Sequence, residues 1–386
     1  MQEAGGSDSP TEERTAMQFD FSDDQKELRD GVRRLLDQRC PISVVRAVAD
    51  GEAGHSAELW REIGESGFLA AAVPEQYGGV GAGYLELCLV AQELGRSLAP
   101  LPTVSSVYQA SEALLIAGSD AQKAAWLPRL ASGAAIGTVA LAERPGETTP
   151  GAIAATVRGG KLSGVKIPVA DGIAADLAIV LAKDEAGGQS LFLADLGAAG
   201  VTREGVKTID PTRKHARLSF ADTPVEPLGA AGQGWALLDR VRDRAAVLTA
   251  FEQIGGAEAA LFMARDYALQ RFAFGRQIGS FQAIKHMLAD MYVALELARS
   301  NCYYGAWALS VDSDTLPAAA ASARVAATQA YQLCSANTIQ VHGGMGFTWE
   351  FDCHLHYRRS NYLALALGGA SLWESRLIAA IRPRAA

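Results

Sequence analysis

Residues 234–272 read GWALLDRVRDRAAVLTAFEQIGGAEAALFMARDYALQRF, a long stretch in which apolar residues recur with the spacing of an α-helix. Two similar stretches follow at residues 281–310 and 316–344, and alanine, a strong helix former, is frequent in all three. Helices of this length with broad apolar faces usually pack into a bundle, often across subunits. The C-terminal part of the chain is therefore predicted to be a helical bundle.

Upstream of this bundle the sequence pattern changes twice. Between about residues 134 and 228, short runs rich in Val, Ile, Leu and Phe alternate with Gly, Asp and Pro, which is typical of β-structure. From residue 19 to about 130 the helical spacing prevails again, with Ser22 as the expected N-cap of the first helix. The predicted fold class is α+β. It comprises a disordered tail (1–17), an N-terminal helical domain (18–133), a middle small β-barrel or sandwich (134–229) and a C-terminal four-helix bundle (230–386).

Composition excludes several classes of protein. With 386 residues, 49% hydrophobic and 20% charged, the chain is typical of globular proteins and not of disordered ones. A formal charge of −8 without a basic block argues against nucleic acid and anionic membranes as partners. No apolar run approaches the roughly 18 residues that a membrane span requires, and the polar N-terminus lacks the features of a secretory signal. Five scattered cysteines without a CxxC pair indicate reduced thiols and a cytoplasmic location.

Five groups of short motifs occur in a fixed order along the chain after Met17. They are VPEQYGG (73–79) with ELGR (93–96); GKLSGVK (160–166); ADL (175–177); the spaced residues Tyr267, Arg271, Phe274, Gly275, Ile278, Phe281, Gln282, Ala289 and Asp290; and QVHGGMG (340–346). Together they resemble the acyl-CoA dehydrogenase family over essentially the whole chain. The resemblance implies the fold described above and FAD as the cofactor.

In that family FAD lies between two subunits, and the resemblance assigns its binding here to Arg271, Phe274, Gln282, Gln340, Gly343 and Gly344. The chemistry of these residues agrees with that role. A guanidinium group suits a pyrophosphate, a phenyl ring can lie against adenine, and a glycine pair at a helix end lets backbone N–H groups approach phosphate or ribose oxygens. By the resemblance, these groups contact the flavin of the neighbouring subunit. Taken singly, a solvated arginine and a helix-ending glycine pair would explain the same residues.

The family's reaction, α,β-dehydrogenation of an acyl-CoA thioester, needs a carboxylate that removes the α proton while the β hydrogen leaves as hydride. The resemblance places this base at one of two positions. The first is in the loop after Tyr357-Arg358, where this chain has Leu367, or Gly368 if the loop shifts by one residue. The second is 26 residues before Arg271, where it has Ala245. No catalytic base is therefore predicted in this chain.

The middle domain also departs from the family pattern. Two threonines that offer hydroxyl groups to the flavin in the family correspond here to Ala142 and Ala170. Each lost hydrogen bond is worth about 0.5–1.5 kcal/mol, so two losses would weaken a flavin site more than about tenfold. The chain thus keeps the groups that face a partner's flavin and lacks those that would hold its own.

Three other carboxylates and three histidines were weighed as functional groups. Glu252 follows Ala245 on the same helical face but about 10 Å further along, and Asp243 points to nearly the opposite face, between two arginines that favour an ion pair. Glu374 is expected on a helix beyond the loop. No Cys, Asp or Glu at suitable spacing completes a metal site around the histidines, so no metal is predicted. These histidines are His342, His354 and His356.

The hypothesis that follows is a subunit of a hetero-oligomeric acyl-CoA dehydrogenase whose partner, a homologous chain, supplies the base. It resembles the bacterial two-gene dehydrogenases that act on bulky steroid-side-chain CoA thioesters, and the analogy alone suggests that substrate class. An electron-transfer flavoprotein is the expected electron acceptor. Two alternatives stay open: a homomeric dehydrogenase with a non-standard base, and a catalytically silent scaffold that kept only the fold.

Overall fold

The computed structural model describes residues 21–146 and 148–382, so the predicted tail (1–17) lies outside the described residues. The N-terminal helices begin where the sequence predicts, because Ser22 forms a capping box. Its Oγ accepts a hydrogen bond from the Gln25 N–H (3.2 Å), and its own N–H donates to Gln25 Oε1 (2.9 Å). The helices of this part are α1 (Asp23–Arg39), α2 (Ile42–Asp50), α3 (Ala57–Glu65), α4 (Tyr84–Arg96), α5 (Thr103–Ser105), α6 (Glu112–Ala117) and α7 (Asp120–Ala131).

The middle part is a sheet of eight strands in the order β6-β7-β3-β2-β4-β5-β8, with β1 paired in parallel to β4. Most neighbouring strands are antiparallel, and β4 is buried along almost its whole length, which explains its continuous apolar run. The strands are β1 (Gly137–Ala140), β2 (Thr156–Arg158), β3 (Lys161–Ala170), β4 (Leu177–Lys183), β5 (Gln189–Asp195), β6 (Val201–Val206), β7 (His215–Pro224) and β8 (Glu226–Leu228).

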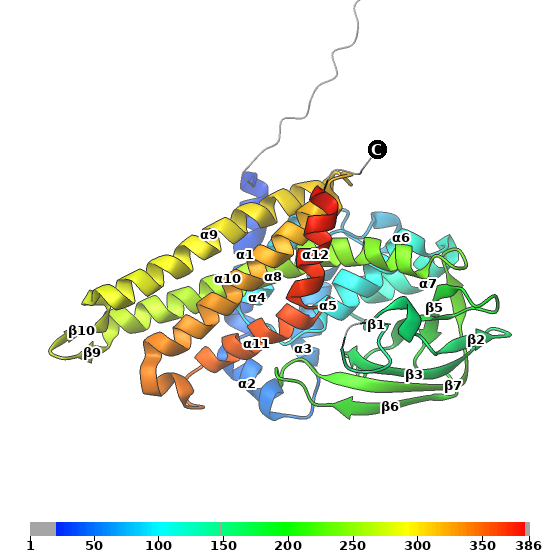
Figure 1. Cartoon of the computed structure of the whole chain (residues 1–386), viewed down its shortest axis with the longest axis horizontal. Coiled ribbons are helices and arrows are strands. Elements are labelled where there is room, and N and C mark those ends of the chain that lie inside the picture. Colours follow the sequence, from blue (N-terminus) through cyan, green and yellow to red (C-terminus); the bar gives the residue numbers. More distant parts are fainter. Residues whose placement is uncertain (1–20, 147, 383–386) are drawn as a thin grey trace, which may run out of the picture.

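Three long helices dominate the C-terminal part, and α8 and α9 are joined by the β9–β10 hairpin (Figure 1). The sheet and this hairpin lie at opposite ends of the molecule, with the long helices between them (Figure 1). The elements are α8 (Gly234–Gln270), β9 (Phe272–Ala273), β10 (Arg276–Gln277), α9 (Gln282–Ser310), α10 (Leu316–His342), α11 (Cys353–Leu365) and α12 (Ala370–Ile381). The predicted fold class is confirmed, whereas the limits of the three domains remain a prediction.

Two glycines set the distance between α4 and α8. A Cβ atom on Gly95 would collide with the backbone carbonyl of Glu252, and one on Gly255 would collide with that of Gln92. The two backbones therefore touch, and the face of α8 that carries Ala245 is sealed against the N-terminal helices. One continuous hydrophobic cluster runs through α1, α4, the sheet and the long C-terminal helices.

Among the helices that the structure describes, none alone has the length and apolarity of a membrane span; α11 and α12 reach both only as a pair bent by 49°.

Candidate functional site

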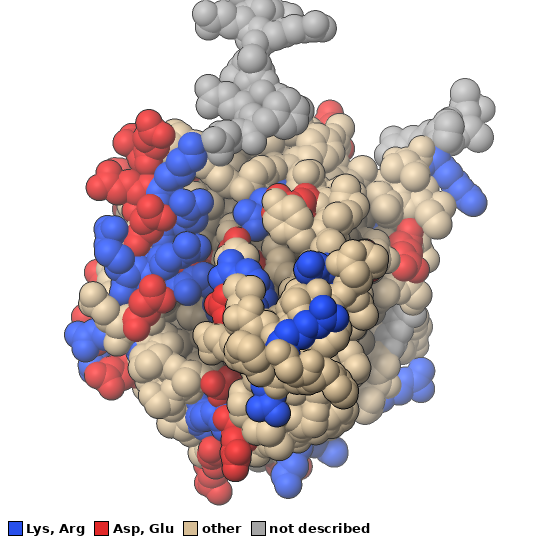
Figure 2. Space-filling view, turned by 90° about the vertical axis from the view of Figure 1, so that its left-hand side faces the viewer, with Lys and Arg blue, Asp and Glu red and all other residues tan. Residues whose placement is uncertain are grey.

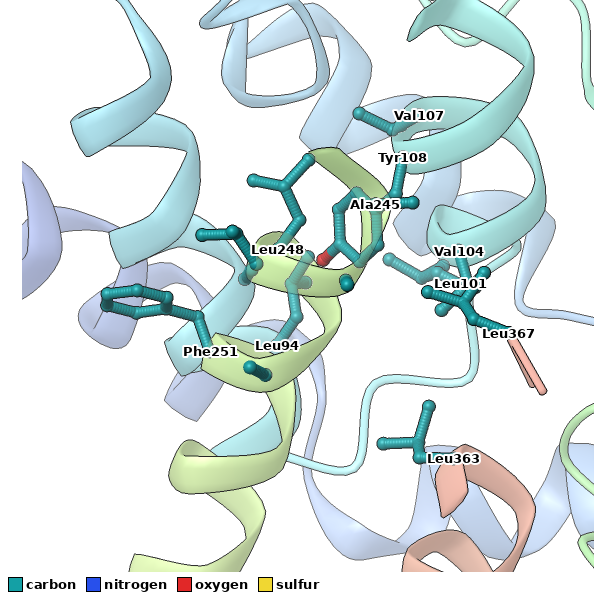
Figure 3. Close-up of a cluster of buried hydrophobic side chains, with 14 of the residues drawn as sticks. Leu94, Leu101, Val104, Val107, Tyr108, Ala245, Leu248, Phe251, Leu363 and Leu367 are labelled. Carbon is teal, nitrogen blue, oxygen red and sulfur yellow. The ribbon is translucent and has the colours of Figure 1, made fainter. Parts of the chain in front are cut away.

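The two positions at which the family could carry its base belong to one buried hydrophobic cluster (Figure 3). Ala245 lies on α8 and Leu367 in the loop between α11 and α12, and both are almost inaccessible to solvent. Tyr108, Leu101 and Val104 are packed around them in the same cluster (Figure 3). A side chain from either position therefore meets mainly hydrophobic neighbours.

Gly368, the second loop position considered for the base, is a poor position for a longer side chain. Its φ is +104°, in the region that favours glycine, and a Cβ atom would collide with the Leu372 side chain. Leu367 is therefore the loop position from which a longer side chain would enter the cluster.

Tyr108 reaches the cluster from an irregular segment, because residues Ser106–Ser111 form a π-helical turn between α5 and α6. Such turns insert one extra residue per turn and change the direction of side chains. The ring of Tyr108 is completely buried, and its hydroxyl has no hydrogen-bond partner among the described residues. Burial raises the pKa of this phenol well above its usual value, so Tyr108 is neutral.

Of the three carboxylates considered as substitute bases, two form ion pairs and one is exposed, although Glu252 lies close enough to Tyr108 of the cluster for its charge to raise the pKa of that phenol. Glu252 is fully buried on α8 and pairs with Arg213 at 2.7 Å. Asp243 pairs with Arg376 of α12 at 2.6 Å, so its ion-pair partner comes from a distant helix and not from the adjacent arginines that the sequence suggested. Glu374 lies on α12 and is exposed.

Ala142 and Ala170 lie on the side of the sheet that would face the chain's own flavin. They present methyl groups at the two positions where, by the resemblance, the family has threonine hydroxyls. The Ala142 carbonyl accepts a hydrogen bond from the Ile167 N–H at 2.8 Å, and the Ala170 carbonyl accepts one from Thr138 Oγ1 at 2.6 Å. Both alanines are thus held by backbone contacts, and neither side chain can bond to a ligand. The polar groups of this edge fit FAD poorly.

Glu143, beside Ala142, is also engaged. It accepts hydrogen bonds from Lys166 Nζ (2.8 Å) and from the N–H groups of Ala154 (2.7 Å) and Ala155 (2.9 Å). Burial alone would raise the pKa of this carboxyl, but these donors outweigh it and lower the pKa. Glu143 is therefore ionised and fastens the loop after β1 to β3.

The six residues predicted to bind a neighbour's flavin lie at the exposed end of the long helices. The Arg271, Gln282 and Gln340 side chains are exposed, and Phe274 is 95% exposed at the tip of the hairpin. A Cβ atom on Gly343 or Gly344 would meet nothing within 4 Å. Figure 2 faces this end of the molecule and shows Lys and Arg side chains across its centre. These groups fit a phosphate-bearing ligand that approaches from outside.

Contacts between α8 and α10 connect the end of α8 that precedes Arg271 with the end of α10 that precedes the glycine pair. Tyr267, one helical turn before Arg271, stacks on His342 at 4.1 Å between ring centroids, and His342 is the last residue of α10, directly before the glycine pair. A hollow of about 340 Å³ opens beside them, lined in part by Tyr267, Gln270 and His342.

One detail of the sequence prediction is corrected here. The glycine pair follows the C-terminal end of α10, where the free backbone groups of the helix are carbonyls and not N–H groups. The N–H groups that could face a phosphate belong instead to the 3₁₀ turn Gly343–Phe347 that begins there. The left-handed φ of Gly343 (+58°) makes this reversal of direction possible.

The histidines that suggested a metal site lie apart in separate contacts. His342 Nδ1 bonds to the Thr338 carbonyl (2.7 Å), His356 Nδ1 to the Tyr331 hydroxyl (3.0 Å), and His354 stacks on Trp349. Within residues 21–146 and 148–382, no group of three or more His, Cys, Asp or Glu side chains could hold a metal ion.

Sequence reasoning missed a buried ionic cluster formed by Asp210, Arg213, Glu252 and Arg359. From the sequence, Glu252 is considered only as a possible base, and no role is assigned to the other three residues. Charged residues scattered over 150 positions carry no local spacing that would reveal such a cluster.

The chain combines helices before and after a β-sheet with exposed groups that could contact a dinucleotide, and the comparisons with known proteins show which family has this arrangement. A model of the acyl-CoA dehydrogenase N-terminal domain matches residues 22–134, and one of the acyl-CoA dehydrogenase C-terminal domain matches residues 232–380. The chain belongs to the acyl-CoA dehydrogenase family, whose members are FAD-binding oxidoreductases that act on acyl-CoA.

The similar proteins include bacterial acyl-CoA dehydrogenases, and one solved structure is of a protein called a steroid acyl-CoA dehydrogenase. The chain is 34% identical to acyl-CoA dehydrogenase IpdE2 of Mycobacterium tuberculosis over 354 residues, which is 92% of this chain and 94% of the relative. A chain of the ChsE4-ChsE5 complex from Mycobacterium tuberculosis superimposes with a TM-score of 0.86 at 29% identity, covering 95% of this chain and 100% of that one. A chain of the Tcur3481-Tcur3483 steroid acyl-CoA dehydrogenase superimposes with a TM-score of 0.84 at 30% identity. The match covers 93% of this chain and 97% of that one.

Proposed function

We propose that this chain is the subunit without a base in a hetero-oligomeric, FAD-dependent acyl-CoA dehydrogenase. A homologous partner chain holds the flavin and supplies the carboxylate, and this chain completes the flavin site from outside. The observation that carries the proposal is an asymmetry. Ala245 and Leu367 lie in a closed hydrophobic cluster, whereas Arg271, Phe274 and the glycine pair lie open at the surface.

The comparisons support the partner and the substrate class. One similar structure is the complex of two differently named chains, ChsE4 and ChsE5. Another has the double name Tcur3481-Tcur3483 and is called a steroid acyl-CoA dehydrogenase. We therefore assign the substrate to bulky, steroid-derived acyl-CoA thioesters, which the partner subunit binds beside its flavin. An electron-transfer flavoprotein would reoxidise the complex.

The residues of this chain act by binding and orientation. Bound FAD supplies the hydride acceptor of the reaction. Arg271 would pair with the pyrophosphate through two parallel N–H donors, and its fixed charge offsets that of the phosphates. Phe274 would cover the adenine and exclude water, while N–H groups of the turn Gly343–Phe347 would hold phosphate or ribose oxygens. Proton removal is left to the partner, because Ala245 and Leu367 occupy the two positions at which the family resemblance places the base.

A cytoplasmic location is part of the proposal. All five cysteines are free and buried, and burial raises the thiol pKa of each, as suits unreactive thiols in a reducing compartment.

Expression of the chain alone and together with the homologous chain from the same gene neighbourhood tests the proposal. We expect a colourless or insoluble protein alone, and a yellow, active complex on co-expression. A yellow homomer that oxidises acyl-CoA would instead favour the homomeric enzyme with a non-standard base. A stable colourless protein that no homologous chain renders active would favour the scaffold.

A further inference from the structure

Four charged side chains meet in the interior, where three parts of the molecule join. Asp210 and Arg213 come from the loop between β6 and β7, Glu252 from α8, and Arg359 from α11, and each is at most 2% exposed. Two arginines and two carboxylates make the group formally neutral. The group is called the junction cluster below.

Arg359 makes the largest number of contacts in the junction cluster. Its Nε donates to Asp210 Oδ2 at 2.5 Å and its Nη2 to Thr212 Oγ1 at 2.7 Å, both on the sheet side. Its Nη groups also donate to the carbonyls of Leu98 (3.3 Å) and Ala99 (3.4 Å), which follow α4 in the N-terminal part. One guanidinium on a C-terminal helix thus binds both other parts of the chain.

Arg213 forms the second bridge. From the sheet side, its Nη2 donates to Glu252 Oε1 on α8 at 2.7 Å and to the Ala99 carbonyl at 3.4 Å. Burial alone would raise the pKa of Asp210, but the Arg359 charge and the Thr212 hydrogen bonds outweigh it and lower the pKa. The carboxylates, in turn, raise the pKa of Arg359 against the effect of burial. The Asp210–Arg359 pair is therefore charged in the folded protein.

We infer that the junction cluster holds the sheet against the N-terminal and C-terminal helices in place of a bound flavin. The inference rests on the proposed function, in which this chain carries no FAD of its own. By the family resemblance, a chain that holds its own FAD would contact the cofactor through the sheet edge that here carries Ala142 and Ala170. Without that ligand the sheet depends on protein contacts, and removing one partner of a buried ion pair is strongly destabilising because the other charge stays unpaired.

Amide hydrogen exchange of the full chain, alone or in its complex, tests this inference. For each variant, the exchange rate is measured in the segments that face the substituted residue across the junction, and not in the element that carries the substitution. Arg359→Gln changes α11, and exchange is followed at residues 207–214 and 98–101. We expect exchange there to rise at least about tenfold and Tm to fall by roughly 5–10 °C, with β4 and α9 unchanged. If this variant fails to fold, Thr212→Val removes only one hydroxyl of the same network, and the readout is α11 and residues 98–101.

Glu93→Gln is the matched control. Glu93 is also fully buried and pairs with two arginines, Arg33 and Arg96, but all three lie in the N-terminal helices. This variant should lower Tm without faster exchange at residues 207–214 or in α11. If Arg359→Gln and Thr212→Val leave exchange across the junction as slow as in the unaltered chain, the inference is wrong.

Added FAD separates this inference from the proposed function. The isolated chain should show the same Tm with and without FAD. A rise in Tm with FAD would contradict the proposed function. If FAD has no effect but amide exchange across the junction stays slow in the variants, only the role of the junction cluster is contradicted.

Discussion

At the scale of single residues, the account depends on what surrounds Leu367 and Arg271. Leu367 lies in a closed cluster with Ala245 and Tyr108, and Arg271 lies open beside the hairpin. The prediction that this chain lacks a base rests on the sequence alone, since it needs only the identity of two positions, and it stays a prediction. The packing of Tyr108 around them could not be predicted, because a π-helical turn has no reliable signature in a single sequence.

Leu367→Glu should not create a dehydrogenase. The new carboxylate would be buried in the hydrophobic cluster without a partner, at a cost of several kcal/mol, and would bind a proton instead of acting as a base. We expect the free energy of unfolding to fall by about 3–5 kcal/mol and no acyl-CoA oxidation. Denaturant titration and an activity assay measure both. Leu365→Glu, at a position 68% exposed in the same segment, is the control and should change stability little.

Arg271→Gln should release flavin from the complex. A charge-assisted hydrogen bond is worth about 1.5–3 kcal/mol, so FAD affinity should fall roughly 10- to 100-fold. The measurement is the flavin retained by the complex after dialysis. Arg265→Gln removes a neighbouring surface arginine that pairs with Asp266, and it should retain flavin as the unaltered complex does. Equal retention in both variants would contradict the assigned role of Arg271.

Glu112 should make stability depend on pH. Burial raises its pKa to about 7, although Arg244 and the Tyr84 hydroxyl oppose the shift. Because the folded state binds this proton more tightly than the unfolded state, the contribution is present at low pH and is lost as pH rises from about 4.5 through 7. Glu112→Gln should remove this pH-dependent part of the free energy of unfolding, which amounts to roughly 2–4 kcal/mol. Denaturant titrations of both proteins at pH 5 and pH 8 measure this, and parallel profiles would contradict it.

At the scale of elements, close packing of helices closes the cluster around Ala245. Helical and strand segments could be predicted because their apolar spacing is strong over long runs, and Ser22 marked the start of α1 correctly. Contacts between elements could not be predicted in the same way. The touching backbones of α4 and α8, and the pairing of Asp243 with Arg376 of α12, depend on the three-dimensional path of the chain.

Gly255→Ala should separate α4 from α8. The added methyl group would collide with the Gln92 carbonyl, and overpacking of this kind destabilises by about 1–3 kcal/mol or more. Thermal unfolding measures the loss. Gly31→Ala in α1 is the control, because its Cβ would meet only the end of the Arg34 side chain at 3.9 Å; removal of a helical glycine there should stabilise by about 0.5–1 kcal/mol. Equal effects of the two substitutions would show that the α4–α8 contact does not limit the packing.

At the scale of the whole molecule, we propose that one face of the chain completes a flavin site and that the chain holds no FAD of its own. The order of helices, sheet and helices, together with the motifs, was sufficient to predict the family fold and the FAD chemistry. The junction cluster was not predictable, because its members lie far apart in the sequence and carry no motif. It is also the feature by which, in our inference, a chain of this fold would stay assembled without its own cofactor.

Flavin stoichiometry of the purified hetero-oligomer tests the account most directly. Absorbance of released FAD, compared with the amount of each chain, should give one FAD for every two chains, and the chain purified by itself should bind none. One FAD bound to every chain of the complex, or a full equivalent of FAD on this chain in isolation, would contradict the account.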